Sequence, residues 1–534
     1  MAKGKKKEVL TLEEHLQAAL LPESEQPYQV PGNWCWTRMQ NIARWGSGGT
    51  PSRKIPEYYE GTIPWLKTGE LNDDYIFETE EHITKDAIIN SSAKLFPVNT
   101  VAIAMYGATI GKVCILGVKA ATNQACACGV AYPEINFKYL FYYARSQKNA
   151  FINQGKGGAQ PNISQEIIKS HPFPLSPLPE QSRIVDRIEG LFAKLDEARQ
   201  KVQDVLDGFE PRRAAILHKA FNGELTAQWR KEHGVGMEEG WERKRFDEVA
   251  IIRSNLVAPA GFPNLPHIAP DNIEKKTGVL LEYHTIAEDG VTSGKHHFYP
   301  GQILYSKIRP YLSKVVAVDF EGLCSADMYP IEAKGDAKCL WYYMLSEEFL
   351  EQASSAGSRS VLPKINQREL SALMVKLPEL SDEQNEITNI LDNLFAKEQQ
   401  AKEIAEATLE QIDLIKKSIL ARAFRGELGT NDPAEESSLE LIKQTLLETI
   451  ANDNILEVRT LDRIEVKFVP KTILDALAGG RRLTPEDLKS EIDLHIDDFY
   501  EQLKELIDKG QVIEIRIDGE SYLEEVDADR QTEN

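Results

Sequence analysis

The sequence predicts a mixed α/β protein in which two strand-rich domains are joined by two long antiparallel coiled-coil helices with pseudo-two-fold symmetry. Three observations predict this fold class. A unit of about two hundred residues occurs twice, each copy begins with short β-branched and aromatic runs, and each copy ends in a long heptad-patterned segment. A chain of 534 residues is too long to fold around a single hydrophobic core. Its contents of 42% hydrophobic and 27% charged residues are those of an ordinary globular protein.

The repeat is read most clearly near the end of each copy. "ILHKAFNGEL" at 216–225 returns as "ILARAFRGEL" at 419–428, with seven of ten letters identical, and "LFAK" at 191–194 recurs unchanged at 394–397. Other echoes keep offsets between 200 and 207; they pair Trp34–Ala43 with Trp241–Ala250, Thr100–Val113 with Gln302–Val315, 138–143 with 338–343, "PNI" at 161–163 with "PKI" at 363–365, and "EQ" at 180–181 with 383–384. This period is too long for a solenoid and indicates one duplication.

The duplication divides the chain into seven expected segments. They are an N-terminal helical arm (1–27), a first α/β domain (28–178), a first helical spacer (179–238), a second α/β domain (239–378), a second helical spacer (379–428), a linker with a helix (429–469) and an acidic C-terminal domain (470–534). In both α/β domains, runs such as "TVAIAMYG" and "KVVAVDF" alternate with glycine, proline and asparagine turns, which favours short strands.

The two spacers carry apolar residues at steps of four and three, which predicts long helices that pack on each other. The expected seams are Ile184, Ile188, Leu191, Leu195, Ala198, Val202, Val205 and Phe209, and Ile387, Leu391, Leu394, Ala401, Ala405, Ile412, Ile415 and Ile419, with Glu398 and Thr408 as polar interruptions. Gly208 and Pro211 are expected to break the first helix, since proline lacks an amide donor. The second helix has Gln411 and Leu414 there and should run straighter.

The C-terminal segment predicts a small winged-helix-like domain. After a linker at 429–438, "TPEDL" at 484–488 is typical of a helix start, and "VIEIRIDGESYLEEV" at 512–526 predicts a hairpin with an Asp-Gly turn. Residues 431–534 contain 27 acidic and 12 basic side chains, a net charge of −15. Because phosphates repel that charge, we expect this domain to dock protein rather than to bind DNA.

The rest of the chain is close to neutral, because the tail holds most of the net charge of −21. A nucleic-acid partner therefore remains possible. The sequence has no run of eighteen apolar residues and no secretory h-region, and its six cysteines form neither a zinc spacing nor a disulfide framework. We expect a cytoplasmic protein that does not enter membranes.

A search for catalytic motifs finds none. "YGATIGKV" at 106–113 lacks the spacing and the hydroxyl residue of a phosphate loop, and the glycine runs at 46–49 and 155–158 lack the dinucleotide-binding pattern. Adjacent His296 and His297 would point to opposite faces of a strand, which is poor for a shared metal. Neither HExxH, GxSxG nor the Asn/Asp-Pro-Pro-aromatic tetrapeptide of adenine methyltransferases is present. We expect no catalytic residue and no metal ligand.

The complete pattern resembles the specificity subunit of a Type I restriction–modification system, a phage-defence system. The resemblance rests on "PLPEQ" and "LSDEQ" at the helix starts, "KAFNGEL" and "RAFRGEL" at the helix ends, and "GGTPSRK", "YYEGTIPWLKTGEL" and "LTAQWR…GW" elsewhere. It covers about residues 28–428, roughly three quarters of the chain. The tail from about residue 430 lies outside the pattern.

The resemblance implies a non-catalytic role. Each α/β domain would be a target-recognition domain that reads one half of a split, asymmetric site in double-stranded DNA. The helices would fix the distance between the halves and dock two methyltransferase (modification) subunits, and restriction subunits, which are ATP-driven translocases and nucleases, would join that core. This chain would hold no cofactor, since S-adenosylmethionine, ATP and Mg²⁺ would belong to its partners.

Candidate DNA-binding residues are basic or amide side chains in expected loops, since arginine and lysine suit phosphate or guanine and amides suit adenine. They are Arg53, Lys54, Lys67, Lys112, Lys156, Gln160 and Asn162 in the first domain, and Lys295, His296, His297, Lys307, Arg309, Lys314, Arg359 and Lys364 in the second. Phe221 and Phe424 are either partner anchors or part of the core at the helix ends.

Two other classes of function remain open from the sequence. The chain could be a self-contained DNA methyltransferase or nuclease with an unrecognised site, which methyl transfer from labelled S-adenosylmethionine by the chain alone would reveal. It could also be a coiled-coil scaffold that never meets DNA, which a gel shift with and without a methyltransferase partner would reveal.

Overall fold

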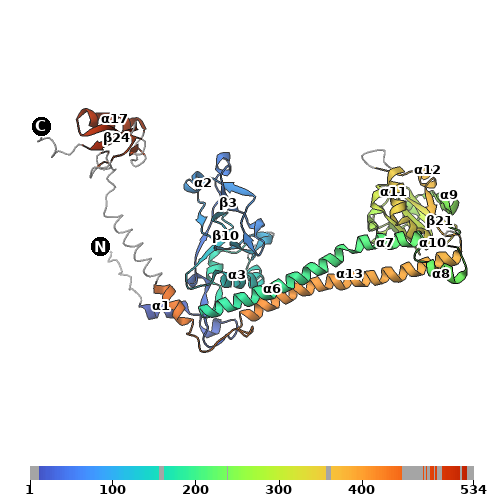
Figure 1. Ribbon diagram of the computed structural model, residues 1–534, viewed down its shortest axis with the longest axis horizontal. Coiled ribbons are helices and arrows are strands. Elements are labelled where there is room, and N and C mark those ends of the chain that lie inside the picture. Colours follow the sequence, from blue (N-terminus) through green and yellow to red (C-terminus); the bar gives the residue numbers. More distant parts are fainter. Residues whose placement is uncertain are drawn as a thin grey trace. The chain divides into compact units, whose positions relative to one another are not determined.

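The structure is a computed structural model that describes residues 11–155, 162–236, 239–356 and 363–447, and in the C-terminal segment residues 473, 477, 482–485, 488–489, 496–517 and 520–525. The chain forms two compact units (Figure 1). One consists of residues 1–182 and 430–534 and the other of residues 183–429. Each unit contains one of the strand-rich domains, and the expected mixed α/β class is confirmed.

The first strand-rich domain consists of short strands with a few helices. Its strands are β1 (Cys35–Arg38), β2 (Ala43–Ser47), β3 (Ile63–Leu66), β4 (Tyr75–Ile76), β5 (Glu81–Ile83), β6 (Leu95–Phe96), β7 (Val101–Ala104), β8 (Val113–Leu116), β9 (Ala120–Thr122), β10 (Cys126–Ala131) and β11 (Pro172–Leu175). Its helices are α2 (Lys85–Ile89), α3 (Phe137–Ser146), α4 (Lys148–Gln154) and α5 (Gln165–Ser170), and α1 (Leu12–Ala19) precedes them.

The second strand-rich domain is built from a similar set of elements. Its strands are β12 (Arg243–Arg245), β13 (Ala250–Ile252), β14 (Leu256–Val257), β15 (Pro266–Ile268), β16 (His284–Thr285), β17 (Lys295–Phe298), β18 (Ile303–Ser306), β19 (Val315–Ala317), β20 (Gly322–Cys324), β21 (Met328–Ala333) and β22 (Met374–Lys376). Its helices are α8 (Ala227–His233), α9 (Phe246–Val249), α10 (Ala337–Met344), α11 (Glu347–Ala356) and α12 (Gln367–Ser371).

The two domains share one strand order. Sheet β2-β10-β7-β8 of the first domain corresponds to β13-β21-β18-β19 of the second, and β5-β3-β9-β6 corresponds to β16-β15-β20-β17. Each second sheet contains one parallel pair, β3 with β9 and β15 with β20. The short pairs β1–β11 and β12–β22 also correspond. The domains differ in β4 and β14, which extend different sheets at their edges. The repeat read from the sequence is therefore a repeat of topology.

In the second domain, β18 shows how the layers form. Alternate side chains of a strand point to opposite faces. Ile303 and Tyr305 join a core with residues of α10, α11 and the long helices, whereas Leu304, between them in sequence, joins a second core with residues of β17 and β20. The sheet that contains β18 is thus buried on both faces, between helices and the other sheet.

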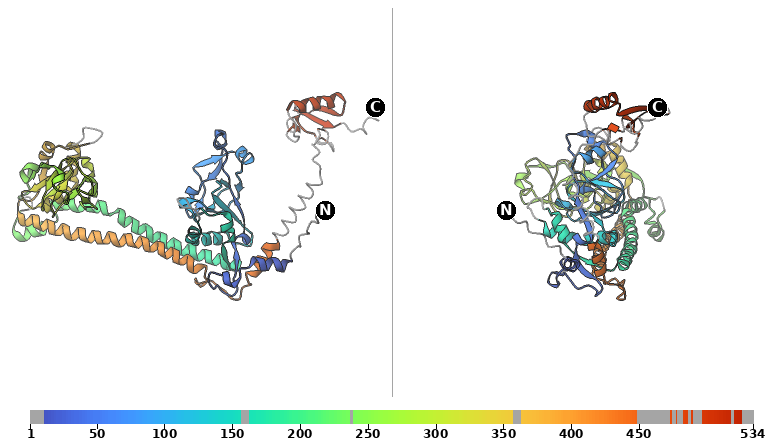
Figure 2. Two further views of the ribbon diagram at one scale, coloured as in Figure 1. Left: turned by 180° about the vertical axis from the view of Figure 1, so that it is seen from behind. Right: turned by 90° about the vertical axis from the view of Figure 1, so that its left-hand side faces the viewer.

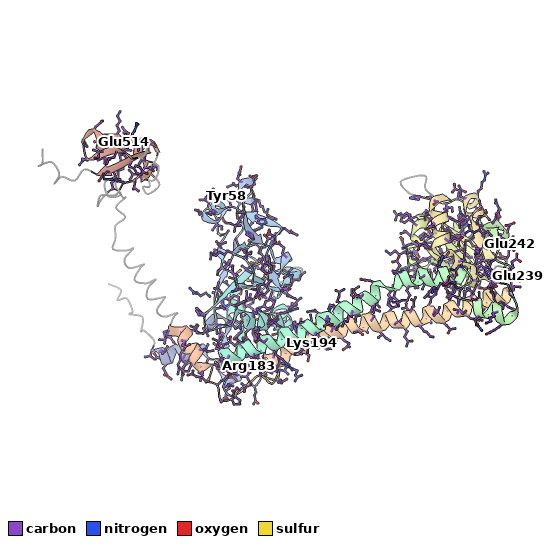
Figure 3. All side chains as sticks on the ribbon, viewed as in Figure 1. Tyr58, Arg183, Lys194, Glu239, Glu242 and Glu514 are labelled. Carbon is purple, nitrogen blue, oxygen red and sulfur yellow. The ribbon has the colours of Figure 1, made fainter. Side chains whose placement is uncertain are left out.

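The spacers form the long helices α6 (Leu178–Asp207), α7 (Phe209–Phe221) and α13 (Ser381–Ala423). The first spacer is interrupted at Gly208, and Pro211 has no amide hydrogen to donate to Asp207, as the sequence predicts. In contrast, α13 continues without interruption for 43 residues. Figures 1 and 2 show α6 and α13 side by side over much of their length, and Figure 3 labels Lys194 on α6 in this stretch.

The pairing of α6 with α13 is antiparallel. Asp196 pairs with Lys416, and Arg199, three residues further along α6, pairs with Asp413, three residues earlier on α13. The Lys416 ammonium also lies 5.0 Å from the centre of the Phe192 ring. The predicted antiparallel coiled coil is confirmed.

The predicted seam residues are partly wrong. Ala401 is exposed, and Val205 and Ile415 expose 46% and 45% of their surface. The other predicted seam positions are buried or half-buried. Buried and half-buried residues that were not predicted include Phe192, Arg199, Leu206, Phe395, Lys402, Leu409, Lys416 and Ala423. Arginine and lysine occupy seam positions because their methylene stems pack while their charged ends reach outward. A seam predicted from the most apolar residues is therefore displaced by one residue at Val205, Ala401 and Ile415.

The C-terminal segment contains α17 (Ile496–Asp508) and the antiparallel strands β23 (Val512–Ile517) and β24 (Glu520–Glu525). The predicted strand pair is confirmed, and its Asp-Gly turn lies outside the described residues. The amide of Leu488 donates to the carbonyl of Thr484 (2.9 Å), as expected for a helix start there. Most residues on which the winged-helix interpretation depends also lie outside the described part. Among described residues, no helix has the length and apolarity to cross a bilayer.

Candidate nucleic-acid interface

A glutamine near the start of each long helix fixes the neighbouring strand-rich domain. Gln181 Oε1 accepts the backbone amide of Asn136 at 2.9 Å, and Gln384 Oε1 accepts that of Asp336, also at 2.9 Å. Asn136 and Asp336 are the N-cap residues of α3 and α10. The repeated contact holds an equivalent helix of each domain against the start of a long helix.

The glutamate before each glutamine is fully buried, and we call its contacts the glutamate latch. In the second unit, Glu383 accepts hydrogen bonds from Trp241 (3.3 Å) and Thr226 (2.7 Å) and forms an ion pair with Arg230 (2.7 Å), which is also fully buried. Thr226 and Arg230 follow the end of α7. The segment after the first long helix is therefore fastened to the start of the second.

The first unit has the same latch with different chemistry. Glu180 accepts hydrogen bonds from Trp34 (2.8 Å), Thr430 (3.3 Å) and Asn431 (2.7 Å). Thr430 and Asn431 follow the end of α13, so the segment after the second long helix is fastened to the start of the first. These residues were not predicted as a group, although the repeated "EQ" and "GEL" motifs, with a threonine soon after "GEL", were the signal in the sequence.

In the first domain, the loop after β7 pairs with the segment before α5. Tyr106 and Asn162 form an antiparallel bridge, and the amide of Ile163 donates to the carbonyl of Met105 (2.9 Å). Tyr106 and Asn162 are exposed, and Lys112 at the end of the loop is half-buried. Two of the predicted DNA-binding residues, Lys112 and Asn162, thus belong to this pair of strand-end segments.

The second domain repeats this pair of segments, which we call the paired loops in both domains. Ile308 and Lys364 form the bridge, and the amide of Ile365 donates to the carbonyl of Lys307 (2.9 Å). The amide of Arg309 also donates to the carbonyl of Pro363 (2.8 Å). The paired loops therefore bring three predicted DNA-binding residues, Lys307, Arg309 and Lys364, to one edge of the domain.

Acidic and carbonyl oxygens of the domain already engage the lysines of this edge. Asp327 lies 3.2 Å from the ammonium of Lys364 and 3.9 Å from that of Lys307, which donates to the carbonyl of Ala326 at 2.6 Å. Lys314 donates to the carbonyl of Pro270 at 2.6 Å. These contacts hold the lysines in place, and a phosphate would have to compete with them.

The predicted cations of the first domain lie mainly in a separate cluster. Arg53 forms an ion pair with Glu81 (2.6 Å) and lies 4.1 Å from the centre of the Tyr59 ring. Lys67 pairs with Glu80 (2.8 Å) and Glu81 (3.0 Å). Hydrogen bonds from Arg53 and Lys67 lower the pKa of Glu81, so this carboxylate stays charged and partly neutralises them. Lys54 is exposed beside Arg53.

Three predicted loop residues of the second domain are instead buried in β17. Lys295, His296 and His297 expose 6%, 3% and 9% of their surface. Lys295 donates to the Ser293 hydroxyl (2.7 Å), and His297 Nε2 lies 2.7 Å from Glu321. Burial lowers the pKa values of Lys295 and His296. Their placement in exposed loops was wrong, because a basic run was read as a loop although it fills a central strand.

The remaining predicted residues either lie outside the described part of the chain or are buried. Lys156, Gln160 and Arg359 lie outside the described residues. Phe221 packs edge-on against Tyr343, with ring centres 5.1 Å apart, and exposes only 4% of its surface, while Phe424 exposes 1%. Both rings are taken up by the chain itself, which favours core over partner anchor. Within the described part of the chain, no group of three or more His, Cys, Asp or Glu residues could hold a metal ion.

Duplicated strand-rich domains, paired helices and solvent-facing loops define the class as a two-domain recognition protein. The chain matches the Type I restriction modification DNA specificity domain over residues 31–205 and again over 238–409, together about two thirds of its length. It therefore belongs to the family of Type I restriction–modification specificity subunits.

Individual relatives agree with this assignment. The EcoDI specificity subunit of Escherichia coli is 38% identical over 325 residues, which cover 57% of this chain and 73% of that protein. The EcoKI specificity subunit of E. coli K12 is 22% identical over 77% of this chain and 92% of that protein. A structure from a study of type I R-M complex assembly and conformational transition has a TM-score of 0.58 at 19% identity, covering 75% of this chain and 100% of that one, and supports the fold.

Membership gives the chain its role. Specificity subunits supply DNA sequence recognition to Type I restriction–modification complexes and are not their catalytic components. The alternatives of a self-contained enzyme and of a scaffold without DNA are thereby disfavoured.

Proposed function

We propose that each strand-rich domain reads one half of a bipartite DNA site, mainly through its paired loops. One observation carries this proposal: the strand orders of the two domains correspond, whereas the side chains on the paired loops differ. A repeated framework with unlike loops is what two different half-sites require, since base contacts specify sequence and the framework only positions them.

We further propose that the long helices fix the gap between the half-sites. At a rise of 1.5 Å per residue, the 43 residues of α13 span roughly 65 Å, compared with about 34–36 Å for one turn of DNA. Linking two readers at a fixed distance converts two modest affinities into one selective interaction through effective concentration.

The helices would also dock two methyltransferase subunits. Support comes from apolar side chains that α13 leaves in solvent, since Ile404, Leu414 and Ile415 expose 60%, 54% and 45% of their surface. Exposed apolar side chains on a helix can contribute to a contact surface for another protein. Restriction subunits would join the resulting core, and S-adenosylmethionine, ATP and Mg²⁺ would be bound by these partners.

Domain replacement tests the reading role. Residues 28–178 would be exchanged for the corresponding domain of a relative with a different site, and genomic methylation would be sequenced in cells that also express the methyltransferase subunits. We expect one half of the methylated motif to change while the other half and the gap stay the same. A change in both halves, or in neither, would contradict the proposal.

The spacer role needs an insertion that preserves the helix pairing. One heptad would be added after Gln203 in α6 and one after Leu409 in α13, because the observed ion pairs place these positions opposite each other. Seven residues lengthen a helix by roughly 10 Å, so the gap should grow by roughly three base pairs. A four-residue insertion after Leu409 alone should also alter the gap, with a disturbed seam. An unchanged gap in the paired insertion would refute the spacer role.

A further inference from the structure

The paired loops of the two domains share unusual backbone angles but carry different side chains. In the first domain, Gly107 and Gly111 have φ values of +62° and +75°. The positions 202 residues later are Arg309 and Ser313, with φ values of +48° and +47°. The same left-handed turn is thus made from glycine in one domain and from side-chain-bearing residues in the other.

Left-handed backbone is unfavourable for any residue with a Cβ atom, and glycine alone adopts it freely. Pro310 adds to the conflict, since a following proline favours extended backbone at the residue before it. The first domain demonstrates that glycine suits this turn. An arginine that remains in a strained loop position at a binding surface indicates that its side chain is needed there.

The side chain at this position faces open space. Arg309 is exposed, and among the described residues none accepts a hydrogen bond or an ion pair from its guanidinium. A Cβ atom built on the equivalent Gly107 would meet no atom within 4 Å. The neighbouring Lys307 and Lys364 differ from Arg309, because both contact oxygens of the domain.

We propose that Arg309 reads a guanine in the half-site of the second domain, an inference that rests on the proposed function. Its backbone is fixed by two hydrogen bonds, from its amide to Pro363 (2.8 Å) and from the amide of Leu312 to its carbonyl (2.9 Å). A fixed origin favours the bidentate contact of a guanidinium with O6 and N7 of guanine. Phosphate contact needs no such position, since Lys307 and Lys364 could make it without backbone strain.

The test uses the full chain assembled with its methyltransferase subunits. The wild-type motif would first be read from genomic methylation, and binding would then be measured to a duplex carrying that motif and to duplexes with each guanine replaced. For R309G we expect discrimination at one guanine of one half-site to fall by roughly ten-fold to one hundred-fold, with the other half and the gap unchanged. R309K should fall between wild type and R309G, because it keeps the charge but loses the planar fork.

The S313G variant is the matched control. It relieves the same kind of strain without removing a charge, so its motif should equal that of wild type. Both R309G and S313G should keep or raise the midpoint of thermal unfolding. An unchanged motif for R309G, a uniform loss of binding across all letters, or a lowered unfolding midpoint would each overturn the inference. If wild type itself gave no bipartite motif, the proposed function would fail instead.

Discussion

The two glutamate latches hold equivalent positions but differ in charge. Glu180 is surrounded by neutral donors from Trp34, Thr430 and Asn431, whereas Glu383 faces the buried guanidinium of Arg230. Strand order is nevertheless the same in both units. Backbone pairing and apolar packing therefore specify the repeated fold, while the polar contacts that hold it together can diverge.

The largest expected effect is the loss of stability in E383A, compared with the smaller loss in E180A. Removing Glu383 leaves a buried arginine without its partner, which should cost about 3–5 kcal/mol. Removing Glu180 leaves the neutral donors of Trp34, Thr430 and Asn431 unsatisfied, at about 1–3 kcal/mol. Denaturant unfolding of the full chain measures both.

E383Q sharpens this test because it keeps the shape of the side chain. It should lie between wild type and E383A if charge is the reason for the difference. Equal losses for E383A and E180A would show that the two latches are energetically the same.

A second comparison concerns His171 and the corresponding Leu373, which precede β11 and β22. The carbonyl of His171 accepts the amide of Met39 (3.0 Å), and that of Leu373 accepts the amide of Phe246 (2.8 Å). Burial lowers the pKa of His171 to about 4. The folded protein therefore favours the neutral ring. The free energy of unfolding has its full value above pH 6.5 and decreases by about 3 kcal/mol as the pH falls towards 4.

The variant H171L should remove this dependence, since leucine already fills the corresponding site of the second domain. Free energies of unfolding for wild type and H171L would be compared between pH 7 and pH 4.5. We expect H171L to become more stable relative to wild type as the pH falls. A difference that stays constant with pH would contradict burial of a neutral histidine.

In the paired loops, a smaller change of stability is expected for G107R, and it is a loss, opposite in sign to the change expected for R309G. G107R places an arginine at the left-handed position of the first domain, where space is open, so the expected loss is about 1–2 kcal/mol from backbone strain alone. A108R, on the exposed neighbouring residue without a positive φ, is the control and should change stability little. Similar losses in both variants would mean that strain is not the cause.

The smallest effect is expected at the exposed ion pairs of the coiled coil. The side chains of Arg199 and Asp413 expose 36% and 58% of their surface. A double-mutant cycle with R199A and D413A should give a coupling of about 0.2–1 kcal/mol that falls as salt is added. The antiparallel register would be in doubt if no coupling were measured at low salt.

Four features could be predicted from the amino-acid sequence: the duplication, the α/β class, the break at Gly208 and the uninterrupted second helix. These features follow from repeated letters and local chain stiffness, which are properties of neighbouring residues. The burial of individual side chains was predicted less well. The residues of β17 were expected in an exposed basic loop, and Ala401 and Ile415 were expected in the seam.

The surroundings of each side chain depend on long-range packing and could not be predicted. The latches join residues about 150 or 250 positions apart, such as Arg230 with Glu383 and Asn431 with Glu180. Burial in β17 depends on strands that pair from distant parts of the chain, and the aliphatic stems of Arg199 and Lys416 become apolar surface only when a second helix covers them. Long-range packing carries no local pattern in the letters, and for that reason the loop at Arg309 also became distinctive only once its backbone angles were known.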